Sequence, residues 1–309
     1  MARGALPHSR LPSAARRAPL LVLALALIGI SFAAPLVRLS SAHPLAIATW
    51  RLGFSLVVIV ALLVPERGWR QWARLDRRGV AVALGAGAML ALHFWSWNTS
   101  LGLTTVAASV LLVNLQPVII AGLSVAWLRE RPSRRQWMGI GVAMVGALVV
   151  AFPDFRNATI RADSRALLGD VLALAGAVTA AVYYLAGRKL RQTLDLWPYV
   201  ALVYGACFVT LLIIGATLAL PLWPQPPREL AIFAALAIGP MMLGHTGMNW
   251  ALKYLPAYVV NLTTLGEPVG ATLLAAMLPG IREVPSALTL AGGLIVLTGI
   301  LVALPRRAG

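Results

Sequence analysis

Glu267 is an ionisable side chain inside a long apolar stretch of the 309-residue chain, and Pro268 follows it directly. Counting from the start of that stretch puts Glu267 about 12 residues in, roughly 18 Å deep at 1.5 Å per residue. A charged acid at such a depth costs several kcal/mol, so it must face a cavity, pair with a base or carry a proton. The position therefore predicts a proton-exchanging site, as proton-coupled transport requires. A protonated acid that only bonds a neighbouring helix is the structural alternative.

Arg51 is the second such side chain, and it lies about seven residues inside another apolar run, beside Trp50. Arginines inside a membrane usually face a cavity or a partner. The planar guanidinium suits a carboxylate or phosphate group, which predicts a contact with an anionic part of a substrate. The alternative is a side chain that reaches toward the membrane surface, about 10 Å away, and covers that distance only in part.

Two prolines, Pro117 and Pro268, stand in the middle of apolar runs. Each removes a helical hydrogen bond and crowds the carbonyl group four residues before it. In transporters, carbonyl groups freed in this way line substrate sites or mark bends. A fixed kink that improves packing is equally compatible with the pattern.

Aromatic and amide side chains supply the remaining candidates for a small-molecule cavity, since flat rings give contact area and amides fix orientation. For the tryptophans the alternative is the interfacial belt, and for the histidines it is a hydrogen bond between helices. The candidate lining residues are Trp50, His93, Trp97, Asn98, Gln116, Tyr183, His245, Asn249 and Asn261.

The composition indicates which elements must position these residues. The chain is 60% hydrophobic and 12% charged, against about 45–50% and about 25% in soluble domains. Its apolar runs are continuous, which predicts an all-α integral membrane protein with ten transmembrane helices. The runs fall near 18–38, 44–64, 79–99, 104–127, 136–152, 167–187, 197–220, 230–251, 255–278 and 286–304.

The net charge of +16 does not indicate nucleic-acid binding, because the arginines stand at the ends of apolar runs. Placing both termini in the cytoplasm puts most of the 26 Lys and Arg residues on the inner side, as the positive-inside rule requires. The sequence thus predicts a multi-pass protein of the cell (inner) membrane. The first run is interpreted as a membrane anchor rather than a removed signal peptide.

The sequence also contains an internal repeat. Asn249, Leu252 and Pro268 each lie 151 positions after an identical residue in the first half, and Glu267 stands where the first half has Gln116. We expect a basic N-terminus at 1–17, five-helix repeats at 18–152 and 167–304, a periplasmic linker at 153–166 and a cytoplasmic C-terminus at 305–309. Five spans is an odd number, so the two repeats are expected to be inverted relative to each other.

These doubled motifs resemble the drug/metabolite transporter superfamily, EamA type. The matching segments are 98–101, 114–117, 127–132 and 139–146 in the first half, and 249–254, 266–268, 282–285 and 292–299 in the second. Glycines spaced by seven after Pro132 and Pro285 would let the last helix of each repeat approach a neighbour closely. The resemblance implies ten helices and export of small metabolites or drugs, amino-acid-like compounds among them, without ATP hydrolysis.

The motifs that are missing agree with a carrier that has no cofactor, no catalytic residue and no bound metal. No P-loop, zinc-protease or nucleophile-elbow pattern occurs, and the single cysteine excludes a disulfide within the chain. The expected partners are a small-molecule substrate, membrane lipid and protons, with the oligomeric state open. Two other hypotheses remain at this point: an enzyme acting on lipid-linked substrates, and a passive facilitator.

Overall fold

The computed structural model describes residues 13–104, 106–157, 164–277 and 286–304. Within these ranges every regular element is helical, which confirms the all-α prediction. The predicted C-terminal tail at 305–309, residues 1–12 of the basic N-terminus and the motif at 282–285 lie outside the described residues.

The helices follow the predicted apolar runs closely. The first half contains α1 (Ser13–Ser31), α2 (Ala33–Leu39), α3 (Pro44–Leu63), η1 (Gly68–Arg74), α4 (Arg77–Ser100), α5 (Val106–Val113), α6 (Gln116–Trp127) and α7 (Arg134–Asn157). The second half contains α8 (Ser164–Leu190), α9 (Leu196–Thr217), α10 (Pro227–Leu236), η2 (Ala237–His245), α11 (Thr246–Ala251), α12 (Ala257–Asn261), η3 (Leu262–Gly266), α13 (Glu267–Met277) and α14 (Ala287–Ala303).

Several helix starts are explained by local chemistry. The Asp76 carboxylate accepts a hydrogen bond from the Gly79 amide at 2.7 Å, and the Ser286 hydroxyl accepts one from the Thr289 amide at 3.1 Å. Both contacts satisfy amide groups that have no partner inside the helix. Pro44 opens α3, where its missing N–H group costs nothing.

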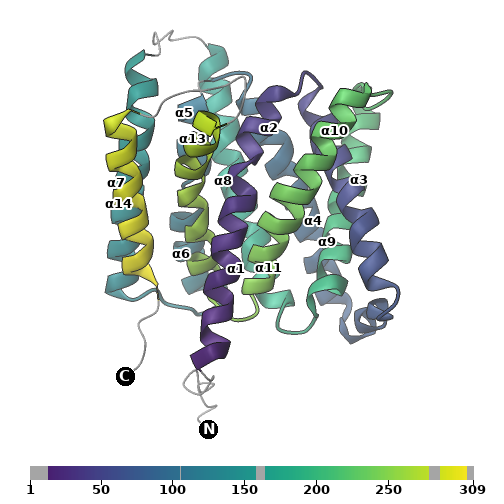
Figure 1. Ribbon diagram of the computed structural model, residues 1–309. Coiled ribbons are helices and arrows are strands. Elements are labelled where there is room, and N and C mark those ends of the chain that lie inside the picture. Colours follow the sequence, from purple (N-terminus) through teal and green to yellow (C-terminus); the bar gives the residue numbers. More distant parts are fainter. Residues whose placement is uncertain (1–12, 105, 158–163, 278–285, 305–309) are drawn as a thin grey trace.

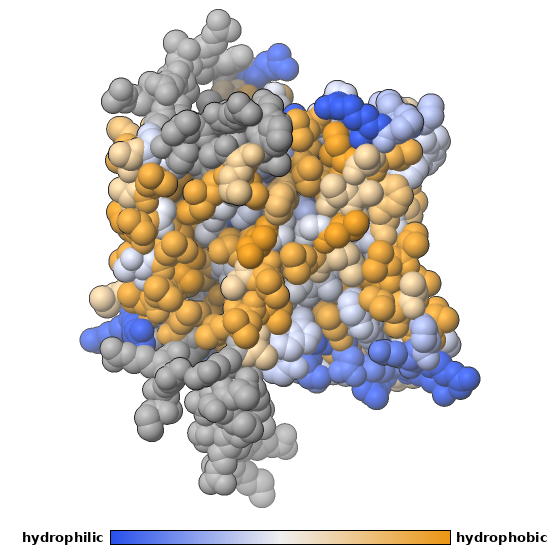
Figure 2. Space-filling model, in the orientation of Figure 1, coloured by the Kyte–Doolittle hydropathy of each residue, from blue (hydrophilic) through white to orange (hydrophobic). Residues whose placement is uncertain are grey.

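The surface has the character of a membrane protein. On the face that Figure 2 shows, a broad apolar band crosses the middle of the molecule, with hydrophilic residues at both ends. Seven described helical stretches are long and apolar enough to cross a membrane, against the ten spans predicted. The predicted runs at 136–152, 255–278 and 286–304 are helical in α7, α12 to α13 and α14, but they are not among the seven.

The described residues at both ends of the predicted linker at 153–166 are helical. Helix α7 continues to Asn157, and α8 begins at Ser164. Residues 158–163 lie outside the described part of the chain.

Helices α7 and α14 lie side by side at one edge of the bundle (Figure 1). A Cβ atom added to Gly146 would stand 2.5 Å from the Val296 amide nitrogen, and one added to Gly299 would stand 2.3 Å from the Ala143 amide nitrogen. Since real Cβ atoms do not approach that closely, these positions require glycine. The close helix approach predicted from the spaced glycines is confirmed.

The two halves are interleaved. Helix α4 packs against α8 and α9, α3 packs against α9, and α1 packs against η2 and α11. The start of α1 and the end of α14 lie at the same face of the bundle (Figure 1), which we call the terminal face. The core therefore consists mainly of contacts between helices of different halves.

Candidate functional site

Two helix interruptions meet near the centre of the bundle. Helix α5 ends at Val113, and α6 begins at Gln116 after a turn. In the second half the 3-10 segment η3 ends at Gly266, and α13 begins at Glu267. The two new helices thus start at equivalent positions, each one residue before the proline that prevents a continuous hydrogen-bond ladder.

A third irregular segment was not expected from the sequence. The segment η2 forms a π-helix that contains Pro240, and the wider turn accommodates a residue without an N–H group. It ends at His245 and also carries Met241, and both side chains are buried. A proline inside the predicted run at 230–251 was the available indication of this distortion.

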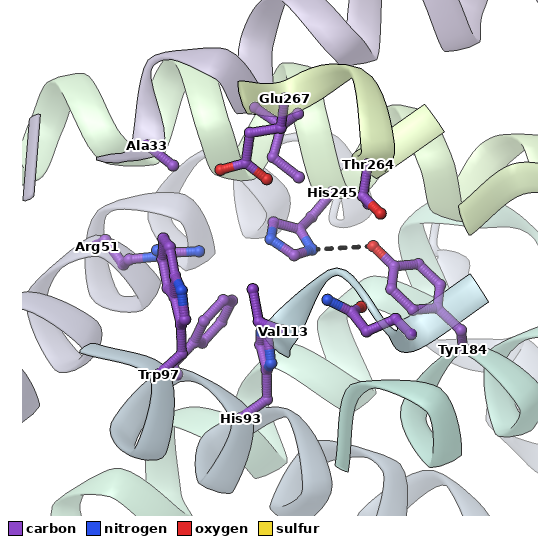
Figure 3. Close-up of a pocket in the computed structure, with 12 residues that line it drawn as sticks. Ala33, Arg51, His93, Trp97, Val113, Tyr184, His245, Thr264 and Glu267 are labelled. Carbon is purple, nitrogen blue, oxygen red and sulfur yellow. Dashed lines mark hydrogen bonds between the residues drawn. The ribbon is translucent and has the colours of Figure 1, made fainter. Parts of the chain in front are cut away.

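These segments surround a cavity with about 30 Å³ of free space, which suffices for little more than one water molecule. Figure 3 shows its polar side chains pointing toward one another from several helices. Six predicted site residues line it: Arg51, His93, Trp97, Gln116, His245 and Glu267. Six further lining residues were not among the predicted site residues: Ile30, Ala33, Phe94, Val113, Tyr184 and Thr264.

Arg51 is a buried cation whose hydrogen bonds are incomplete. Only 1% of the residue is exposed, and its guanidinium carbon lies 3.8 Å from the centre of the Phe94 ring. Among the described residues the guanidinium forms one hydrogen bond, from Nη2 to the Met241 sulfur at 3.6 Å, and Nε and Nη1 have no partner. Arg51 also forms no ion pair with any described residue.

The histidines of the cavity are held by hydrogen bonds. His93 Nδ1 lies 2.9 Å from the carbonyl oxygen of Gly176. A carbonyl only accepts, so we assign the proton of the neutral ring to Nδ1, which leaves Nε2 as an acceptor. The His245 Nδ1 lies 3.3 Å from the Tyr184 hydroxyl, as the dashed line in Figure 3 marks. The rings of His93 and His245 approach each other edge to face, with 6.5 Å between their centres.

Two other predicted cavity residues, Asn249 and Tyr183, belong to a separate polar cluster nearer the terminal face. The Asn249 amide nitrogen donates to the hydroxyls of Tyr183 and Tyr204, and its side-chain oxygen accepts from Tyr199 at 3.4 Å. Arg191 donates to the Asn249 carbonyl at 3.0 Å and to the Leu194 carbonyl. The cluster ties the α8–α9 turn to the end of α11.

The equivalent contact in the first half is much weaker. Asn98 donates one hydrogen bond to the Pro44 carbonyl at 3.2 Å, and its side-chain oxygen has no partner. This bond ties the end of α4 to the start of α3, at the face opposite the terminal one. The two asparagines at equivalent positions of the repeats thus form unequal numbers of hydrogen bonds.

The remaining predicted residues do not line the cavity. Trp50 donates to the Leu222 carbonyl at 2.8 Å and stacks on Phe233. The Asn261 amide contacts the Gln116 side-chain oxygen at 3.4 Å, which places it one contact away from the cavity. Pro117 and Pro268 do not line it, although the helix starts that they define position Gln116 and Glu267.

Some of the lining residues that were not predicted are neighbours, in the sequence, of residues that were. Phe94 follows His93 directly, and Tyr184 follows Tyr183, so one step around a helix separates each from a predicted residue. Thr264 is the residue whose carbonyl Pro268 crowds. No pattern indicated the small residues Ala33 and Val113.

A further polar contact joins three segments at the terminal face. Asp195 accepts hydrogen bonds from Lys253 and from Gln71, both at 2.9 Å. These two bonds, the one from Lys253 first, lower the pKa of Asp195. The carboxylate thus connects the start of α9, the turn after α11 and η1.

The family that this chain matches and the relatives named below are transporters. The chain matches the EamA-like transporter family twice, over residues 17–152 and 167–304. It is 24% identical, over 90% of its length and 95% of the relative, to an uncharacterized transporter of Archaeoglobus fulgidus. It is 26% identical to the pseudopaline exporter CntI of Pseudomonas aeruginosa, over 77% of this chain and 78% of that protein. A solved crystal structure with 20% sequence identity matches the fold with a TM-score of 0.73, over 93% of this chain and 96% of that one.

Proposed function

The chain belongs to the EamA-like transporter family, and from this premise we propose that it is a secondary transporter that exports small organic metabolites by alternating access. It is a multi-pass membrane protein. In the proposed arrangement ten helices form two inverted five-helix repeats in the cell (inner) membrane, with both termini in the cytoplasm. Protons are the proposed counter-substrate.

The observation that carries this proposal is that a buried cation and an acid line the same central cavity. Arg51 and Glu267 come from different halves, and both line the cavity where the helix interruptions meet. Such interruptions expose backbone and side-chain groups at the depth where carriers bind their substrates. An acid in this cavity is also accessible to a proton once either face opens.

The size of the cavity supports a mechanism with more than one conformation. A site with about 30 Å³ of free space is far smaller than the roughly 300 Å³ or more of ordinary ligand pockets. A substrate therefore enters only after helices move apart. The interleaved halves, the polar cluster around Asn249 and the Asn98–Pro44 hydrogen bond at the opposite face supply the elements that would separate in turn.

A paired experiment tests export and coupling together. Cells that express the wild-type chain, the Glu267→Gln variant or no transporter are compared by untargeted profiling of metabolites in the medium. We expect wild-type cells to release at least one small metabolite faster than both controls. Purified protein in liposomes should then transport that metabolite in exchange for protons that flow down an imposed pH gradient. In Glu267→Gln the transport should no longer depend on the pH gradient, while the protein stays monodisperse.

The outcomes separate the proposal from its alternatives. If the wild-type protein transports the metabolite at a rate that does not depend on the pH gradient, it is a passive facilitator. Formation of a new product by detergent-solubilised protein, with no membrane present, would indicate an enzyme on lipid-linked substrates. The absence of any exported compound would contradict the proposed function itself.

A further inference from the structure

The short helix η1, between α3 and α4, is fixed to the terminal face by several contacts. The Trp72 indole donates a hydrogen bond to the Pro198 carbonyl at 3.0 Å. Gln71 donates to the Asp195 carboxylate and accepts from the Asp195 amide, each at 2.9 Å. A Cβ atom added to Gly68 would stand 2.6 Å from a side chain at the end of α3. These contacts hold η1 against α3 and α9 in one position.

A cluster of exposed arginines lies on this fixed helix and just beyond it. None of them forms an ion pair with a described residue. The same stretch holds two acids, Glu66 and Asp76, so five arginines leave it a net charge of +3. We call these residues the η1 cluster: Arg67, Arg70, Arg74, Arg77 and Arg78. Their guanidinium groups are therefore available to an anion from outside the chain.

The second half shows that this connection does not need such charges in order to fold. Trp72 and Trp223 are equivalent, 151 positions apart, in the connections α3–α4 and α9–α10. The second connection has one arginine, Arg228, which pairs with Glu229 at 3.3 Å and donates to the Leu39 carbonyl. The residues equivalent to Arg70, Arg74 and Arg78 are Pro221, Gln225 and Glu229. The free positive charge is thus a property of the first connection alone.

Exposed apolar side chains lead from the middle of the molecule to the η1 cluster. Along α3 and the residue that follows it, Val57, Val60 and Val64 are spaced by three and four positions, so they share one helix face. Val80 and Leu84 do the same on α4. In Figure 1 the lower end of α3 lies at the edge of the bundle, and Figure 2 shows hydrophilic residues there beneath the apolar band. A ligand at this place meets cations at the surface and apolar side chains deeper in.

We propose that the η1 cluster binds an anionic phospholipid, whose phosphate contacts the arginines and whose acyl chains lie along the exposed faces of α3 and α4. Guanidinium groups bind phosphate oxygens through pairs of parallel hydrogen bonds. The exposed ring of Trp69, within η1, suits the level of the lipid headgroups. A free phosphate ion would use the arginines only. The proposal does not depend on the transport function.

The positive-inside rule by itself predicts less than this. It requires only an excess of basic residues near helix ends on one side, wherever they stand and however mobile they are. Basic residues near a membrane surface attract anionic lipids in general. A rigidly placed cluster with apolar side chains beside it adds a defined site, which should retain a lipid after the surrounding membrane is removed.

The test compares lipids that differ in headgroup charge. Purified full-length protein in detergent is titrated with phosphatidylglycerol or with phosphatidylcholine of the same acyl chains, and bound lipid is counted by native mass spectrometry. We expect the wild-type protein to retain phosphatidylglycerol in clear preference. Each arginine at an anionic surface contributes about fivefold to binding, so combining Arg70→Gln, Arg74→Gln and Arg78→Gln should weaken phosphatidylglycerol binding about 100-fold. Binding of phosphatidylcholine should stay unchanged.

A matched variant separates a site from diffuse attraction. Combining Arg131→Gln, Arg134→Gln and Lys189→Gln removes the same charge from exposed positions of the same face, outside η1. It should weaken phosphatidylglycerol binding by less than about fivefold, since these charges act only through solvent. An equal loss in the two variants would overturn the proposal. Size-exclusion chromatography shows whether each variant is monodisperse.

If a variant fails to fold, the wild-type protein still decides. A photoreactive phosphatidylglycerol should crosslink mainly to peptides from 57–84, and an even spread of crosslinks over the terminal face would overturn the proposal. Equal retention of the two lipids would do so as well. Displacement of the bound lipid by soluble glycerol 3-phosphate at millimolar concentration would show that the arginines serve a free phosphate instead, and the lipid assignment would be wrong.

Discussion

The two equivalent asparagines make a matched pair of perturbations at opposite faces. In Asn249→Ala the chain loses hydrogen bonds to Tyr183, Tyr204 and Tyr199, whereas Asn98→Ala removes one bond to the Pro44 carbonyl. If these bonds keep their respective faces closed, the first variant should favour opening of the terminal face. The second should favour opening of the other face.

The magnitudes follow from the unequal numbers of bonds. Each buried hydrogen bond contributes about 0.5–1.5 kcal/mol net, so the three bonds of Asn249 contribute about 1.5–4.5 kcal/mol together and the single bond of Asn98 about 0.5–1.5 kcal/mol. If the bonds form only in the closed state, Asn249→Ala shifts the equilibrium toward terminal-face opening by roughly 12- to 1,600-fold. Asn98→Ala shifts it the other way by roughly 2- to 12-fold.

Thiol labelling measures this shift. The lone cysteine, Cys207, is buried and would be replaced by alanine, and Thr264→Cys would then report on the cavity that it lines. A membrane-impermeant maleimide is added to intact cells or to everted vesicles, and the labelling rates are compared. We expect Asn249→Ala to accelerate labelling from the terminal face and Asn98→Ala to accelerate it, by less, from the opposite face.

The two variants also control for each other. If Asn249→Ala leaves terminal-face labelling unchanged while the protein remains folded, the cluster does not close that face and the reasoning is wrong. Equal acceleration from both faces in one variant would indicate general loosening instead. The double variant should show shifts that partly cancel, because the sites lie at opposite faces.

Three further predictions concern the supports of the site. Gly146→Ala should destabilise the protein by about 1–3 kcal/mol, because the new methyl group would meet the α14 backbone at 2.5 Å. Gly141→Ala on the same helix meets nothing within 4 Å and should be neutral or slightly stabilising. Thermal unfolding in detergent compares the two variants, and an equal loss of stability would contradict the close packing of α7 against α14. Arg191→Gln should remove the hydrogen bonds to the Asn249 and Leu194 carbonyls and so increase protease cleavage at the α8–α9 turn. The exposed Arg74→Gln serves as the control. Unchanged cleavage would contradict a role of Arg191 in keeping the terminal face closed. Because the pKa of Asp195 is lowered in the folded protein, its contribution to stability is present at neutral pH and is lost as pH falls through that pKa. The thermal stability of the wild-type protein should therefore fall somewhat more than that of Asp195→Asn between pH 7 and acidic pH. Parallel curves of stability against pH for the two proteins would refute this.

Helix positions and the acid–base pair of the site were predictable because membrane helices satisfy their own backbone, and their ends follow hydropathy and proline. Arg51 and Glu267 were conspicuous since few charges occur within apolar runs. The doubled proline motif also placed both helix interruptions correctly.

The facing of individual side chains was less predictable. Tyr183 and Tyr184 are neighbours in sequence, yet one contacts Asn249 and the other lines the cavity with His245. One residue corresponds to about 100° of helix rotation, so a small error in rotation exchanges their roles. The π-helical turn at Pro240 adds such a rotation within η2, and the proline in the sequence indicates a distortion there but not its size.

The interleaving of the two halves has a consequence for the integrity of the chain. Helix α7 meets α14, α4 meets α8 and α9, and α1 meets η2, so each half completes its core with helices of the other. The peptide connection between α7 and α8 is then not what holds the halves together. Two separate chains, one ending after α7 and the other starting at α8, should reassemble into an active pair when they are expressed in the same cell. Neither chain alone should accumulate as a folded protein, because its glycines at the α7–α14 contact and its polar cavity residues would then have no partners.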